Sequence, residues 1–124
     1  MREIKYRALG AATNEWVYGY YVVLDSGFEM VECIWELGAE RATPIDRSTL
    51  GQFTGLTDNK GDEVYEGDIV EYYDYTSKEF EVSPVYWSAP MFLVDSGLLF
   101  FRSKGKGKLF DGKIIGNIYQ HKIY

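Results

Sequence analysis

Short aromatic and aliphatic segments, separated at intervals of roughly ten residues by glycine-containing turns, restrict the fold of this 124-residue chain more than any other feature. Tyrosine, phenylalanine and tryptophan make up 17% of the residues, and flat rings favour strands because they pack well on a pleated, half-buried surface. We predict nine strands, at residues 3–8, 16–24, 28–37, 48–54, 69–75, 80–87, 91–94, 98–102 and 113–119. This pattern predicts a mainly β protein, built as a small barrel or a twisted sandwich.

Two of the turns between these segments have recognisable sequences. Residues 25–27 (Asp-Ser-Gly) and 58–61 (Asp-Asn-Lys-Gly) both end on a glycine, which is typical of tight turns between antiparallel strands. Residues 28–37 directly follow the first turn and are predicted as a strand. Their apolar residues also fit a helical period, so one short helix over residues 31–41 is the alternative.

Length and composition indicate one domain that spans residues 1–124. The single cysteine, Cys33, cannot form an internal disulfide and is interpreted as a small buried hydrophobe. The first residues are charged and no apolar run follows them, unlike a signal peptide. The most apolar stretch, residues 84–101, is interrupted by Pro90 and by a turn sequence at 95–97. We therefore expect no membrane span and a cytoplasmic location.

The net charge of −6 is unevenly distributed along the chain. Residues 58–81 hold nine acidic residues against two lysines, a balance of −7. Residues 100–124 hold six lysines and arginines against one aspartate, a balance of +5. Phosphate-driven binding needs a dominant positive surface, so the whole-chain charge argues against general nucleic-acid affinity while the C-terminal stretch remains compatible with it.

Residues suited to catalysis or metal binding are scarce. His121 is the only histidine, and it lies near the C-terminal end, whereas a general base needs a fixed hydrogen-bond partner. Five carboxylates occur in residues 58–68, but Lys60 and Glu63 occupy positions where a calcium loop needs an oxygen ligand and a glycine. We therefore expect no catalytic residues, no metal, no cofactor and no enzymatic activity.

Three tyrosines in the most acidic part of the chain are the predicted protein-interaction residues: Tyr72, Tyr73 and Tyr75. Adjacent residues of a strand face opposite ways, so Tyr73 and Tyr75 share one face and Tyr72 lies on the other. One of these faces must be largely core. Rings surrounded by carboxylates suit a protein partner better than DNA, and this partner is either another protein or a second copy of the chain.

The alternative hypothesis is nucleic-acid binding through the basic segment 102–113. Its glycine-spaced loop suits contact with phosphates, and neighbouring rings suit stacking on bases. The predicted contact residues are Arg102, Lys104, Lys106, Lys108, Phe110 and Lys113.

Three blocks of the sequence resemble the YopX family, small proteins encoded mainly in bacterial phages and prophages. The blocks are residues 1–8 (MREIKYRA), 50–70 (LGQFTGLTDNKGDEVYEGDIV) and 114–119 (IIGNIY). Their order and spacing agree with the family, so the resemblance covers the whole chain. Leu9 and Gly10 depart from the family pattern, which usually has a tryptophan followed by an acidic residue there.

The resemblance implies an SH3-type small β-barrel at residues 48–124, with N-terminal strands from residues 1–45 packed on it and at most one short helix. It implies no catalytic residues, because the family has none assigned, and it indicates a phage accessory protein in the cytoplasm of a bacterial host that binds a host or phage protein. The signature residues are interpreted as structural, with glycines at chain reversals and an aspartate bonded to a turn. They are Gly51, Gln52, Thr54, Gly55, Gly61, Gly67, Asp68, Gly116 and Asn117.

Overall fold

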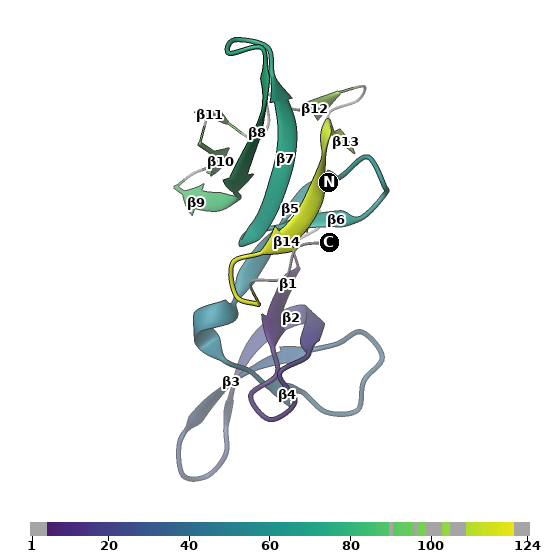
Figure 1. Cartoon of the computed structure of the whole chain (residues 1–124). Coiled ribbons are helices and arrows are strands. Elements are labelled where there is room, and N and C mark those ends of the chain that lie inside the picture. The colour runs from purple at the N-terminus through teal and green to yellow at the C-terminus, as the bar shows by residue number, and fades with distance from the viewer. Residues whose placement is uncertain (1–4, 90, 96, 99–102, 105–108, 121–124) are drawn as a thin grey trace. The chain divides into compact units, whose positions relative to one another are not determined.

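The computed structural model describes residues 5–89, 91–95, 97–98, 103–104 and 109–120 (Figure 1). The chain forms two compact units, residues 1–53 and residues 54–124. Strands dominate both units, and the regular helix in the described residues is a single 3₁₀ turn. The mainly β prediction is therefore confirmed. No helix in the described part of the chain has the length and apolar character needed to cross a bilayer.

The first unit is an antiparallel sheet. Its elements are β1 (Tyr6–Leu9), β2 (Trp16–Asp25), β3 (Met30–Trp35), β4 (Thr43–Pro44), the 3₁₀ helix η1 (Arg47–Thr49) and the start of β5 (Gly51–Thr57). The strand order is β5-β1-β2-β3-β4. Its core is a cluster of Ala8, Ile34 and Ile45, with the half-buried Tyr6, Val17, Tyr21 and Leu50 packed around it.

Residues 30–35 form a strand, so the alternative of a helix over residues 31–41 is wrong. β3 pairs with β2 in continuous register from Tyr20 opposite Trp35 to Asp25 opposite Met30. The ladder forms because the turn at residues 25–29 closes locally, and a helix cannot share its backbone hydrogen bonds with a neighbouring strand. Cys33, on β3, is buried as expected, and burial raises the pKa of its thiol.

The predicted strand at residues 48–54 begins later than expected, at Gly51. The preceding residues form η1, because the carboxylate of Asp46 accepts hydrogen bonds from both the N–H (3.1 Å) and the hydroxyl (2.7 Å) of Ser48. An aspartate that caps the first turn in this way favours a helical turn over a strand.

The second unit contains two three-stranded sheets and the short strands that join the end of β5. Its elements are the rest of β5, then β6 (Glu63–Tyr65), β7 (Asp68–Asp74), β8 (Glu79–Pro84), β9 (Tyr86–Ser88), β10 (Met91–Val94), β11 (Gly97–Leu98), β12 (Ser103–Lys104), β13 (Leu109–Phe110) and β14 (Gly112–Asn117). Strand order is β14-β7-β8 in one sheet and β11-β10-β9 in another, while β5 pairs with β6 and β13. The core consists of Leu56, Val64, Val70, Tyr72, Val85, Phe92 and Val94, with Ile114 against it.

Several predicted strands of this unit differ from the observed ones at their ends. The predicted strand 80–87 is two strands, β8 and β9, which meet at the buried Val85. The predicted strand 98–102 corresponds to β11, and residues 99–102 lie outside the described residues. Closure of residues 48–124 into an SH3-type barrel and the packing of residues 1–45 on it stay predictions.

A buried carboxylate closes the turn that follows β5. Asp58 is fully buried, and its Oδ1 accepts hydrogen bonds at 2.9 Å from the backbone N–H groups of Lys60 and Asp62. Its Oδ2 accepts a third hydrogen bond, at 3.0 Å, from the N–H of Ile114 in β14. One side chain therefore closes a turn and fastens it to a strand 56 residues away in the sequence.

The signature residues around the next turn also support the backbone. Gly67 has φ +94°, and a Cβ there would lie only 2.7 Å from a ring carbon of Tyr119, so both the conformation and the space require glycine. The carboxylate of Asp68 accepts the N–H of Tyr65 at 2.7 Å. Asn117 uses its Oδ1 to accept the N–H of Tyr119 at 3.0 Å. The N–H of Ile118 donates to the carbonyl of Gly67 at 2.9 Å and so joins the β6–β7 turn to the end of β14.

We expect Asp58→Asn to lower the free energy of unfolding of the second unit by about 2 kcal/mol, measured by urea denaturation followed by circular dichroism. An amide offers one acceptor and one donor, so in either orientation at least one buried N–H loses its partner. The control is Asp62→Asn, because Asp62 is exposed and contributes its backbone N–H to this network. A change of less than about 0.5 kcal/mol in both variants would contradict this role of Asp58.

Candidate functional site

The two strands of the β7–β8 hairpin have one buried and one exposed face. Val70, Tyr72 and Asp74 are buried, whereas Glu71 and Tyr73 between them are only partly covered. This alternation follows from the period of two residues in a strand. It places Tyr73 on the outer face, directly opposite Phe80 of β8.

Three rings meet on this outer face. Tyr73 makes edge-to-face contacts with Tyr75 (ring centroids 4.8 Å apart) and with Phe80 (5.2 Å). Tyr75 is 73% exposed and Phe80 is 70% exposed. Val82, also exposed, lies two residues beyond Phe80 and so shares its side of the strand. We call Tyr73, Tyr75, Phe80 and Val82 the aromatic face.

The hairpin turn holds these rings in place. Asp74 Oδ1 accepts the N–H of Thr76 at 2.9 Å, and the N–H of Lys78 donates to the Asp74 carbonyl at 2.7 Å. Lys78 adopts a left-handed conformation, with φ +60°, which lets the chain reverse towards β8. Tyr75 therefore projects from a hydrogen-bonded turn at the end of two paired strands.

An ion pair borders the aromatic face. Glu71 lies opposite Val82 in the register and forms an ion pair with Lys113 of β14, at 3.6 Å. Glu79 is exposed next to Phe80 in the sequence, but it pairs with the buried Asp74 and so lies on the other side of the strand. The charges beside the rings are therefore balanced, and a partner with an apolar surface suits this face.

The structure separates the three tyrosines predicted to bind a partner. Tyr73 and Tyr75 lie together on the outer face, but Tyr72 is 1% exposed and belongs to the core of the second unit. Tyr72 must be removed from the predicted interaction residues, because its ring is covered by the chain itself. Phe80 and Val82 were missed, although the turn and the alternation of β7 and β8 would have placed them beside Tyr73.

Three of the six predicted nucleic-acid residues lie outside the described residues. These are Arg102, Lys106 and Lys108. The backbones of Lys104 and Phe110 are in β12 and β13. Lys113 is exposed on β14, and its ammonium group is the partner of Glu71. The hypothesis of nucleic-acid binding stays a prediction.

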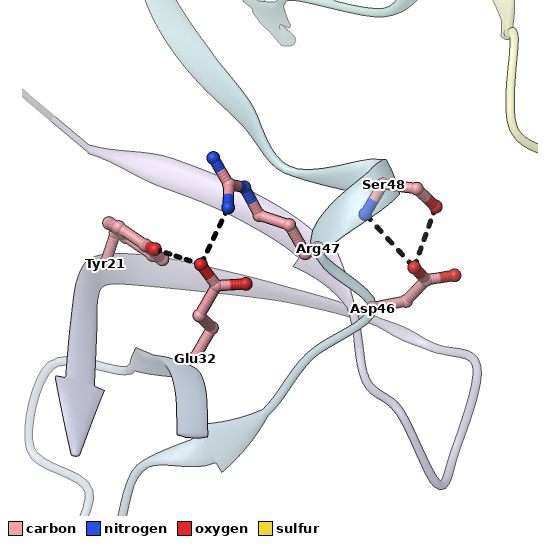
Figure 2. Close-up of polar contacts among 5 residues, drawn as sticks. All are labelled: Tyr21, Glu32, Asp46, Arg47 and Ser48. Carbon is pink, nitrogen blue, oxygen red and sulfur yellow. Dashed lines mark hydrogen bonds and ion pairs between the residues drawn. The ribbon is translucent and has the colours of Figure 1, made fainter. Parts of the chain in front are cut away.

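A second polar cluster, in the first unit, supports its fold (Figure 2). Glu32 Oε1 accepts hydrogen bonds from the hydroxyl of Tyr21 (2.7 Å) and from the guanidinium of Arg47 (2.8 Å). The hydrogen bond to Glu32 raises the pKa of Tyr21, with smaller increases from burial and the Glu32 charge. Because the pKa of Tyr21 is raised, the stabilisation from the Tyr21–Glu32 hydrogen bond is complete at neutral pH. It is lost only when Tyr21 ionises, above pH 10.

Two of the five carboxylates considered for metal binding, Asp58 and Asp68, accept main-chain N–H groups. Asp74, outside that stretch, does the same. Across the residues that the structure describes, no group of three or more His, Cys, Asp or Glu side chains is arranged to hold a metal ion. The buried acids of this protein therefore stabilise turns.

Fold and surface together define a small antiparallel β protein that exposes an aromatic sheet face. The chain belongs to the YopX family: the family profile, described as YopX protein, matches residues 5–122. No curated protein matches the chain significantly. The chain is also similar to a solved structure, the crystal structure of protein EF1440 from Enterococcus faecalis, with 20% sequence identity and a TM-score of 0.57. That match covers 95% of this chain and 94% of the other, and at this identity it shows a shared fold alone.

We expect Tyr72→Ala to destabilise the second unit by about 3–5 kcal/mol, because it removes a buried ring from the core. Tyr75→Ala is the matched control, and we expect a loss below about 1 kcal/mol, the size of one ring contact. Urea denaturation of both purified variants measures the difference. Equal losses would mean that the two tyrosines are not divided between core and surface.

Proposed function

We propose that this chain is a non-enzymatic accessory protein, of phage or prophage origin, that acts by binding a host or phage protein through the aromatic face. The observation that supports this most is the exposure of Tyr75, in the hairpin turn, and of Phe80, on the outer face of β8, each at least 70%. Large rings held rigidly in solvent are typical of residues that provide binding energy in protein interfaces.

The geometry of the face also favours a protein partner. Tyr73 is held between Tyr75 and Phe80, so little side-chain freedom would be lost when a partner covers the three rings. The rings are bordered by the balanced Glu71–Lys113 ion pair, so the face favours a protein surface with an apolar centre.

A non-enzymatic role is supported by the use of the polar groups. The sequence has one histidine, and the buried carboxylates of the second unit are occupied by backbone N–H groups in turns. The phage context comes from the family, whose members are encoded mainly in phages and prophages. A cytoplasmic location in the bacterial host belongs to the same proposal.

The proposal is tested with the full chain as bait in the host bacterium during prophage induction. We expect one protein to be retained by the wild type and by Tyr86→Ser, but lost with the double variant Tyr75→Ser/Phe80→Ser. Tyr86 is an exposed tyrosine of the same unit on a different sheet, which makes it a matched control. With the purified partner, the double variant should bind at least about tenfold more weakly.

Two outcomes would count against this assignment. Retention of the same proteins by all three baits would remove the aromatic face as the binding surface. Sedimentation that shows a dimer of the wild type and a monomer of the double variant would identify a second copy of the chain as the partner.

The alternative function, nucleic-acid binding through residues 102–113, is supported by the positive balance of the C-terminal sequence. It predicts retention of DNA or RNA on filters at low salt and a steep loss of retention as salt increases. If no retention occurs at low salt, this alternative is excluded. Lys113→Ala should weaken retention only slightly, because Lys113 already faces Glu71.

A further inference from the structure

The turn between β2 and β3 exposes a second apolar surface, in the other unit. Residues 23–30, which we call the hairpin tip, carry four exposed apolar side chains: Val23, Leu24, Phe28 and Met30. Phe28 is 100% exposed and Met30 is 63% exposed. The turn extends away from the other strands of its own unit (Figure 1).

Both faces of the ribbon are apolar at this tip. In the register, Val23 lies opposite Glu32 and Asp25 lies opposite Met30, so Val23 and Met30 share one face. Leu24 faces the other way. The core of the unit is reached at Ile34, four residues along β3 from the start of the pairing at Met30. The tip therefore lies beyond the part of the hairpin that the core needs.

Hydrogen bonds hold the turn in one conformation. The carboxylate of Asp25 accepts the N–H of Gly27 at 2.8 Å, and the Ser26 hydroxyl accepts the N–H groups of Phe28 (3.3 Å) and Glu29 (3.2 Å). The N–H of Ser26 closes the turn on the Glu29 carbonyl at 2.9 Å. The backbone at Phe28 is thus ordered before binding, which lowers the entropy lost when the turn docks on a partner.

The charge of the tip specifies its partner. Between Arg7 and Arg41 the sequence has no lysine, arginine or histidine, but it has six carboxylates, of which Asp25 and Glu29 belong to the turn. Glu32, below the tip, is compensated by Arg47. The apolar side chains of the tip therefore have an uncompensated negative border. Such a border repels nucleic acid and anionic lipid and attracts a cationic surface.

We infer that the hairpin tip is a docking element, distinct from the aromatic face, for a protein surface that has an apolar pocket bordered by lysine or arginine side chains. Phe28 enters the pocket, and Met30 and Leu24 cover its edges. Asp25 and Glu29 contact the basic border. With two such surfaces on two compact units, one chain has the means to bind two partners.

The test uses the full chain with the photo-reactive residue benzoylphenylalanine at position 28 in living host cells, followed by identification of the cross-linked peptide. The control carries the same residue at position 37, because Leu37 is 91% exposed in the same unit but lies outside the tip. We expect position 28, and not position 37, to cross-link one protein at apolar residues flanked by lysine or arginine. Cross-links to nucleic acid, to lipid or to a second copy of this chain would overturn the inference, as would equal labelling from both positions.

Binding of the purified cross-linked protein provides the second measurement. Phe28→Ser should raise the dissociation constant at least about tenfold, whereas Leu37→Ser should leave it unchanged. Added salt should weaken binding of the wild type. Phe28→Ser should melt like the wild type, because the ring is fully exposed. Unchanged affinity of Phe28→Ser would overturn the inference. Failure of the aromatic face appears instead in the Tyr75→Ser/Phe80→Ser double variant, so the two proposals are tested separately.

Discussion

The second unit depends on a buried carboxylate that joins a turn to a distant strand. Asp58 accepts three backbone N–H groups, two from its own turn and one from β14, which lies far away in the sequence. Strands of two to seven residues cannot bury much apolar surface on their own. A buried acceptor shared between a turn and a distant strand fixes how such short strands meet, and it leaves no buried N–H of the turn unsatisfied at these positions.

The residues that carry the family resemblance have contacts directed inward or into turns. Gly67 allows the chain to pass close to Tyr119, while Asp68 and Asn117 accept main-chain hydrogen bonds beside it. The outward positions of the same strands are chemically different, because rings occupy them beside carboxylates. The fold and the proposed binding surface are therefore built from alternate residues of the same strands, and a change on the outer face leaves the inner one intact.

Local sequence was sufficient for most of the strands and turns. The turns at residues 25–27 and 58–61 were recognisable because glycine and aspartate determine the backbone there, and β10 occupies the predicted residues 91–94. The sequence left an ambiguity at residues 30–35, which fit either period: the predicted strand is confirmed because these residues pair with β2. One error came from a capping contact, since Asp46 turns residues 47–49, predicted as part of a strand, into a 3₁₀ helix.

The sequence by itself determined that this is a mainly β protein and that Tyr72 and Tyr73 face opposite ways. It also determined that charge is divided between an acidic centre and a basic end. These conclusions follow from the sequence because strand period, turn chemistry and charge are local properties. Only the tertiary structure decided which of the two tyrosines is buried, that Phe80 joins Tyr73, and that Phe28 is left in solvent. Those outcomes depend on strand register and on what packs against each face. Both are set by contacts between residues far apart along the chain, which a local pattern does not contain.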